Sequence, residues 1–323
     1  MGKILLTGDL HANEGIMAEV SVQYLEYIFN YALDNNISTI IFNGDIFEKS
    51  SKIKNEAFVP IFMKLMEYHK KINLIFELGN HDIYNLDNDS IVETFQPFGK
   101  VVKEYEQITL FDKSIDLLSY TKDPDMIPEK GNVLITHLSI ADFQFDNKYH
   151  VNEKNAFPTD LFKEYDIVFS GHFHRHQHKK NIVYIGAPYQ LNYGDGGVNK
   201  GFIVLETDDN SWEFVVYDEA PKYKKIHIKD FDKTDVNNCF VKVFIDGKLD
   251  DYVKLKHLLY EKGAIEVLPD YKEEEETINE NTEVELNQEI KDMMVEYIKG
   301  IEIENIDTDL LVTIFQNRIL GEM

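Results

Sequence analysis

The stretch Ile4-Leu5-Leu6-Thr7-Gly8-Asp9-Leu10-His11 sets the pattern that decides the fold. An apolar run with the character of a β-strand gives way to a glycine, and two potential metal ligands follow it. The same pattern returns four more times, where an apolar run ends in glycine or polar residues. The later motifs are Gly44-Asp45, Gly79-Asn80-His81-Asp82, Thr136-His137 and Gly171-His172-Phe173-His174. Each candidate ligand is therefore expected at the carboxyl end of a strand.

These five motifs predict one shared site. Open α/β sheets bind their ligands beside the carboxyl ends of their strands. A single Asp-x-His or His-x-His pair could consist of ordinary polar loop side chains, but five such motifs in succession are a different matter. Carboxylate, imidazole and amide groups are the ligands that hard or borderline divalent cations need. We therefore predict an α/β fold that carries a site for two metal ions.

The composition indicates a globular chain, with 323 residues of which 43% are hydrophobic. No apolar run approaches the ~20 residues of a membrane span, and a strand that begins at Ile4 leaves no room for a signal peptide. Cys239 is the only cysteine, so no intrachain disulfide can form, and its surroundings predict a buried strand position. A reducing cytoplasm is the expected compartment.

The formal net charge of -25 opposes binding of nucleic acid through the chain's own surface, because phosphate binding depends on lysine and arginine. A local exception is the basic, histidine-rich stretch 172–180, which begins inside the predicted site. Within it, His176 and His178 are interpreted as a solvated hairpin strand in preference to direct DNA contacts. Bound metals would add positive charge at the site, and a partner protein could supply a further basic surface.

The first half of the chain alternates strands with amphipathic helices. Apolar residues recur at helical spacing from Val20 to Leu33, and a second helical pattern covers 55–71, with Pro60 expected in its first turn. The apolar residues of this second helix cover more than one stripe. Either the helix is sandwiched within its own domain, or its outer side meets another subunit. The second sheet of a sandwich is expected to be completed by strands at 182–185, 201–206 and 212–217.

Four segments are predicted along the chain. They are a catalytic domain over 1–220, a small β-α-β cap over 221–269, an acidic flexible linker over 270–289 and a helical segment over 290–323. The linker is dominated by Glu, Asn and Thr, and it cannot bury enough apolar surface to offset its ordering entropy. The segment after it has the pattern of two amphipathic helices. These helices either fold back on the parent domain or, as we expect, fill a groove in a partner protein.

The order of the five motifs resembles that of the calcineurin-like metallophosphoesterase superfamily, over about residues 1–206. The resemblance implies a two-sheet sandwich flanked by helices, with two divalent metal ions bound at the strand ends. Manganese is the expected ion. The implied ligands come from all five motifs: Asp9, His11 and His174 for one metal, Asn80, His137 and His172 for the second, and Asp45 as the bridge between them.

The resemblance also implies two residues that act beside the ligands. His81 matches the family's catalytic histidine, and Asp82 follows it where a carboxylate could fix its tautomer and raise its basicity. A two-metal site activates water for direct attack on phosphorus, so no serine or cysteine nucleophile is required. His81 would act as general acid toward the departing alkoxide, or it would stabilise the transition state electrostatically.

Features outside the candidate ligands indicate which family within the superfamily the chain resembles. The segments 44–48, 184–195 and 200–202, the small cap and the linked helices are similar to SbcD-type double-strand-break repair nuclease subunits, above all to those of T-even-type bacteriophages. This implies a dimeric exonuclease and endonuclease that processes DNA ends in recombination and repair, in the host cytoplasm. Its implied partner is an SbcC-type SMC-like ATPase, bound through the C-terminal helices. The alternative is a stand-alone phosphodiesterase or phosphatase acting on a small nucleotide.

Overall fold

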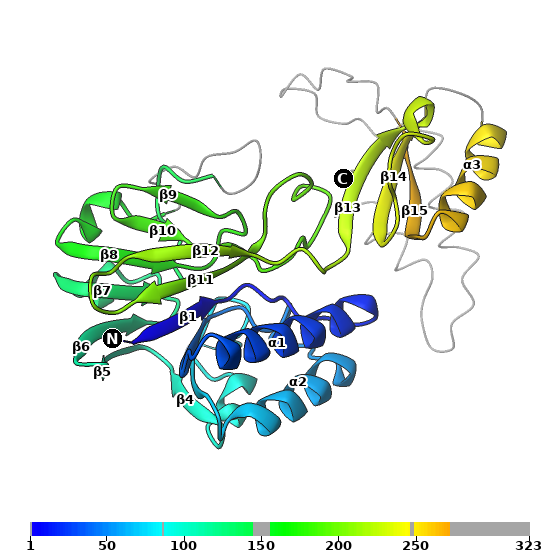
Figure 1. Ribbon diagram of the computed structural model, residues 1–323. Coiled ribbons are helices and arrows are strands. Elements are labelled where there is room, and N and C mark those ends of the chain that lie inside the picture. Colours follow the sequence, from blue (N-terminus) through cyan, green and yellow to red (C-terminus); the bar gives the residue numbers. More distant parts are fainter. Residues whose placement is uncertain (1, 86, 145–155, 246–248, 272–323) are drawn as a thin grey trace, which may run out of the picture. The chain divides into compact units, whose positions relative to one another are not determined.

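Two six-stranded sheets pack face to face in the computed structural model (Figure 1). In sheet order, the first contains β12 (Trp212–Val216), β11 (Gly201–Glu206), β1 (Lys3–Thr7), β2 (Thr39–Asn43), β3 (Asn73–Glu77) and β4 (Gly99–Val102). The second contains β5 (Tyr105–Leu110), β6 (Lys113–Leu118), β7 (Gly131–Thr136), β8 (Tyr165–Ser170), β10 (Ile182–Tyr184) and β9 (Gln177–Lys179). The runs β1 to β4 and β6-β7-β8-β10 are parallel, so their carboxyl ends share an edge within each sheet.

The structure describes residues 2–85, 87–144, 156–245 and 249–271, which belong to the unit Met1–Tyr271. The predicted linker, beyond its first two residues, and the predicted C-terminal helices lie outside the described residues. Short 3-10 turns complete the described elements: η1 (Ile91–Phe95), η2 (Pro124–Met126), η3 (Thr159–Phe162) and η4 (Ile228–Asp230). In the described part of the chain, no helix combines the length and the apolar character needed to cross a membrane.

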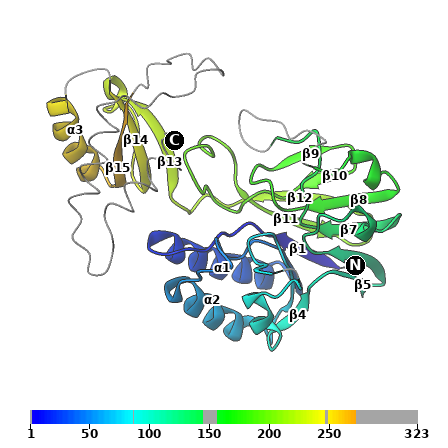
Figure 2. The same ribbon diagram turned by 180° about the vertical axis from the view of Figure 1, so that it is seen from behind.

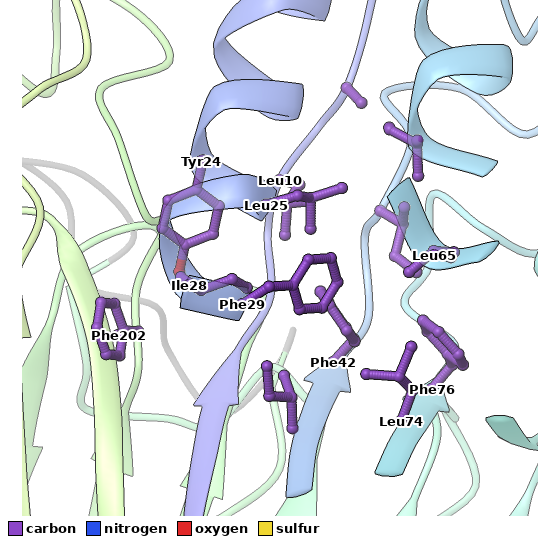
Figure 3. Packing of buried hydrophobic residues seen from close by; sticks show 14 of the residues in the cluster. Leu10, Tyr24, Leu25, Ile28, Phe29, Phe42, Leu65, Leu74, Phe76 and Phe202 are labelled. Carbon is purple, nitrogen blue, oxygen red and sulfur yellow. The ribbon is translucent and has the colours of Figure 1, made fainter. Parts of the chain in front are cut away.

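Helices α1 (Ile16–Asp34) and α2 (Asn55–Tyr68) cover one face of the first sheet, as the two opposite views show (Figures 1 and 2). Side chains of a strand alternate between its two faces. Phe42 and Phe76 therefore point to the helices, where they pack with Phe29 of α1 (Figure 3). Their neighbours Ile41 and Ile75 point to the second sheet. The continuous apolar runs of the sequence are explained by strands that are buried on both faces.

A third, three-stranded parallel sheet lies in the segment that was predicted as the cap. It contains β13 (Lys222–His227), β14 (Cys239–Ile245) and β15 (Ala264–Tyr271), with α3 (Leu249–Glu261) in the connection between the last two strands (Figure 1). Its own apolar cluster includes Val241, Leu259 and Val267. Cys239 is buried at the start of β14, as predicted. The predicted β-α-β elements are present, and β13 is an addition that its lysine-rich sequence did not reveal.

The α/β sandwich flanked by helices is confirmed, but three details of the prediction are wrong. Strands β11 and β12 extend the first sheet, because β11 pairs antiparallel with β1 and covers an edge that would otherwise be open. Pro60 lies inside α2, past its first turn. In the predicted solvated hairpin, His176 is half-buried and its ring stacks on Phe214 with centroids 4.0 Å apart, whereas His178 is exposed.

Candidate metal centre

The structure brings the predicted ligands together from both sheets of the sandwich. The loops after β1, β2 and β3 of the first sheet carry Asp9, His11, Asp45 and Asn80. The loops after β7 and β8 of the second sheet carry His137, His172 and His174. Residues that are up to 165 positions apart in the sequence therefore meet at one site, because the parallel strands of each sheet direct their loops to the same edge.

A first group of ligand-type atoms comes from Asp9, His11 and His174, whose candidate atoms all lie within 4.8 Å of one another. The Nε2 atoms of His11 and His174 are 3.0 Å apart. The main-chain N–H of His172 donates to both carboxylate oxygens of Asp9, at 3.0 and 3.2 Å. This contact joins the first loop of the chain to the last motif and fixes the Asp9 carboxylate in the site.

A second group comes from Asp45, His137 and His172, again with candidate atoms within 4.8 Å of one another. Asn80 lies beside this group, with its Oδ1 2.8 Å from His172 Nδ1. Asp45 Oδ2 lies 3.5 Å from His11 Nε2 and 3.2 Å from His137 Nε2. Asp45 is thus situated between a histidine of the first group and a histidine of the second, which is the position that a bridging carboxylate requires.

His137 provides a test of whether these residues fit metal ions. Its Nδ1–H donates to the Asn43 carbonyl at 2.8 Å, so Nε2 faces Asp45 Oδ2 at 3.2 Å. Nε2 is buried and has no hydrogen-bond partner in the described structure. A buried nitrogen beside a carboxylate oxygen calls for a cation, either a proton on the ring or a metal ion that replaces that proton. The donor set of imidazole, carboxylate and amide groups suits divalent metals, so the residues fit.

The pKa shifts describe a site that needs positive charge. Burial lowers the pKa of His137, but the nearby carboxylates of Asp45 and Asp9 outweigh burial and raise it to about 10. Burial and the neighbouring His137 lower the pKa of His172 to about 3. Burial and His11 hold the pKa of His174 well below its usual range. Two histidines are therefore neutral, as metal ligands must be, while the carboxylates retain a preference for a cation between them.

The backbone of the ligand loops is strained. Asp9, His11 and Asp45 have φ angles of 50°, 47° and 52°, a left-handed conformation that is uncommon for residues other than glycine. Such strain costs on the order of 1–3 kcal/mol per residue and is concentrated at functional sites. Gly79 is required for a different reason, since a Cβ atom there would lie 2.1 Å from Asp45 Oδ1. The glycine of the third motif thus gives the Asp45 carboxylate its space.

His81 lies outside the predicted ligand set, but its candidate atom and those of His11 and Asp45 also lie within 4.8 Å of one another. Its main-chain N–H donates to Asp45 Oδ1 at 2.8 Å. Its Nδ1–H donates to the Glu48 carbonyl at 2.6 Å, so Nε2 is the nitrogen that stays available. The Asp82 carboxylate is placed elsewhere: it accepts N–H bonds from Ile46 and Gly79 at 3.1 and 2.9 Å. The Glu48 carbonyl thus has the role that was expected of Asp82.

Glu48 is a site residue that lies outside the five motifs. Its carboxylate Oε2 lies 3.0 Å from His11 Nδ1, and its carbonyl orients His81. The carboxylates of Glu48, Asp45 and Asp9 outweigh burial and raise the pKa of His11. The sequence placed it three residues after Asp45, at the end of the segment 44–48 that contributes to the resemblance. No spacing rule links such a residue to a ligand on a different loop.

One family model and several known proteins are similar to this chain. A model of the calcineurin-like phosphoesterase family matches residues 2–176, a range that contains all five motifs. Exonuclease subunit 1 of Enterobacteria phage T4 is 25% identical over 339 aligned residues, which cover 96% of this chain and 96% of the phage protein. Among solved structures, Pseudomonas putida nuclease MPE aligns with 14% identity and a TM-score of 0.31, over 54% of this chain and 62% of that one. A protein of unknown function from Aquifex aeolicus aligns with 14% identity and a TM-score of 0.30, over 51% and 91%.

Proposed function

The chain belongs to the calcineurin-like phosphoesterase family, and from this premise we propose that it is a nuclease that hydrolyses phosphodiester bonds of DNA with two divalent metal ions. The observation that carries the proposal is the pair of ligand groups on either side of Asp45. The phage exonuclease subunit supports a nucleic acid as the substrate, because the similarity covers 96% of both chains and so includes the regions beyond the shared metal motifs.

Asp9, His11 and His174 would hold one ion and Asn80, His137 and His172 the other, with Asp45 shared. Bound there, the ions would supply Lewis-acid stabilisation of the phosphoryl oxygens and an activated water. Manganese is the proposed ion, and the mixed imidazole and carboxylate donors of the site are compatible with it. The metal-binding role of each residue is tested by its effect on metal content as well as on hydrolysis.

His81 is the proposed general acid. Its Nδ1–H is engaged by the Glu48 carbonyl, which holds the ring and leaves Nε2 directed away from that bond. A protonated ring can give the Nε2 proton to the departing alkoxide oxygen, a contribution of roughly 10²- to 10⁴-fold in rate. The hydrogen bond from the His81 main-chain N–H to Asp45 fixes the position of this proton donor relative to the proposed shared metal ligand.

We propose that the protein acts with an SbcC-type SMC-like ATPase in DNA end processing, recombination and repair. The phage relative is named as a subunit, which supports a second component for this chain as well. The charge of -25 gives a physical reason for one, because the chain alone is repelled by phosphate. The predicted helices in 290–323 would bind the ATPase, and the predicted linker would allow the catalytic domain to shift.

The outer side of α2 is proposed to join two copies of this chain. Its inner side is buried through Ala57, Ile61, Leu65 and Tyr68. On the other side, Val59, Met63 and Met66 are 52%, 51% and 44% exposed. Their spacing of four and three residues makes one apolar stripe along the helix. Three exposed side chains bury only a small apolar area between the two copies, so the dimer is expected to separate at low protein concentration. The dimer is therefore checked by light scattering over a concentration series.

The experiment that tests the function is a nuclease assay on end-labelled double-stranded and single-stranded DNA with manganese, with and without the ATPase. We expect manganese-dependent cleavage that is lost on chelation. Asp45→Ala, which removes the shared ligand, is the inactive control. A protein that hydrolyses a small nucleotide diester but leaves both DNA substrates intact would contradict the proposal and support the stand-alone phosphodiesterase instead.

A further inference from the structure

The segment 186–200, which connects β10 to β11, reaches the two loops that carry the first ligand group. It begins at Gly186, whose φ of 82° and close approach to the chain at His174 and His176 exclude a side chain, since a Cβ would lie 2.6 Å from the His176 nitrogen. The next residue, Ala187, donates its main-chain N–H to the His174 carbonyl at 3.1 Å. The segment is therefore packed directly against the fifth motif.

Lys200, at the other end of the segment, makes a second contact with the same carbonyl. Its ammonium donates to the His174 carbonyl at 2.6 Å and to Asp195 Oδ1 at 2.7 Å. Lys200 is only 4% exposed, which is rare for lysine. The Asp195 carboxylate is itself fixed by the main-chain N–H of Leu191 at 2.9 Å. A buried charge persists only with such partners, so the position of the His174 carbonyl is strongly determined.

Tyr189 makes the corresponding contact with the first motif. Its hydroxyl donates to the Leu10 carbonyl at 2.6 Å and lies 2.8 Å from Ser21 Oγ. Leu10 stands between the ligands Asp9 and His11, and its side chain is buried under α1 near Tyr24 (Figure 3). The Tyr189 ring is buried and packs edge-on against Tyr24. This hydrogen bond thus holds in place the loop of Asp9 and His11, both of which have left-handed φ angles.

From these contacts we infer that Lys200 and Tyr189 are positioning residues for the first metal, the one held by Asp9, His11 and His174. The inference rests on the proposed two-metal function. The second group is oriented by other residues, since His137 is held by the Asn43 carbonyl and His172 by Asn80. Loss of Lys200 or Tyr189 should therefore weaken one metal site and leave the other unchanged. Loss of groups that orient metal ligands typically lowers metal affinity 10- to 100-fold.

The test is a titration of the full-length, metal-free protein with manganese, in which free Mn²⁺ is measured by electron paramagnetic resonance. The variants are Lys200→Met and Tyr189→Phe, and the second keeps its buried ring. Ser21→Ala is the matched control for Tyr189→Phe, because it removes a neighbour of the same hydroxyl and leaves the Leu10 contact in place. Lys222→Met is the control for Lys200→Met, because it removes a lysine from an exposed ion pair with Asp218.

We expect two sites in the wild type and in both controls, and a 10- to 100-fold loss of affinity at one site in each variant. Should Lys200→Met fail to fold, as judged by circular dichroism, Tyr189→Phe decides the question. Two sites of wild-type affinity in Tyr189→Phe, or an equal loss at both sites, would overturn the positioning role and leave the proposed function intact. A wild type that binds fewer than two ions would instead overturn the two-metal function on which this inference rests.

Discussion

Glu77 allows the electrostatics beneath the metal centre to be tested by stability alone. It is the last residue of β3 and is fully buried, three positions before Asn80. Its Oε1 accepts the main-chain N–H of Leu118 at 3.0 Å, so it joins the first sheet to β6 of the second. Its Oε2 is buried without a hydrogen-bond partner in the described structure. Burial raises the pKa of Glu77 from 4.5 to about 8.

The sign and size of the effect follow from this shift. The folded protein holds the Glu77 proton more tightly than the unfolded chain does. This contribution to the free energy of unfolding is therefore fully present below about pH 4.5, and it is lost as the pH rises from there through about 8. The full pKa difference corresponds to about 5 kcal/mol, of which about 3 kcal/mol is lost by pH 7. Glu77→Gln cannot ionise and retains an oxygen for the Leu118 N–H. The variant should therefore exceed the wild type in stability, by a margin that grows with pH.

The assay is urea unfolding in the presence of a chelator at about pH 5, 7 and 9, followed by circular dichroism. The stability difference between Glu77→Gln and the wild type should increase by several kcal/mol over this series. Glu213→Gln, on the exposed side of β12, is the matched control and should show no such trend. A difference between Glu77→Gln and the wild type that is the same at all three pH values would refute the reasoning.

Four further outcomes are expected. His81→Asn should keep two bound metals and lose roughly 10²- to 10⁴-fold in rate, as measured by metal analysis and single-turnover cleavage; loss of a metal would instead identify it as a ligand. Asp45→Ala should weaken both metals and abolish hydrolysis, and near-normal hydrolysis would contradict the shared ligand. The chain alone should bind DNA weakly with a shallow salt dependence that steepens with the ATPase, whereas a steep slope for the chain alone would contradict the charge argument. Truncation after Tyr271 should leave metal binding and basal cleavage nearly unchanged and remove stable binding to the ATPase in pull-down, and retained binding would exclude the tail as the contact.

The local elements of the fold were predictable because apolar periodicity is a local property. Helices α1 and α2 and the strands before each motif follow directly from it. The assignment of strands to sheets was less predictable, because β11 pairs with β1 across about two hundred residues. No local pattern in the sequence indicates which edge of which sheet a late strand will join. Strand β13 was not predicted, because its three lysines are typical of an exposed segment as well as of a strand.

The candidate site divides in the same way. Its seven proposed ligands stand in short motifs at strand ends, so the sequence alone predicts them as candidate ligands. The metal that each one binds stays a prediction. Glu48, Tyr189 and Lys200 lie in segments that carry the family resemblance, but no role was predicted for them, because each acts through a main-chain carbonyl or an ion pair with a distant loop. Because Asp82 follows His81 in the sequence, its carboxylate was expected to contact the His81 ring. The chain turns at this point, and the carboxylate instead accepts the main-chain N–H of Gly79.

The division of the ligands between two sheets has a consequence for the timing of activity. The first sheet supplies Asp9, His11, Asp45 and Asn80, and the second supplies His137, His172 and His174. On the proposed assignment, neither sheet alone offers the complete coordination of either metal, and Asp45 meets its second histidine only when the faces of the sandwich are joined. A chain in which the two sheets have not yet packed together would therefore lack both sites. Hydrolytic activity would then depend on the packing of the two sheets and not on the folding of either one alone.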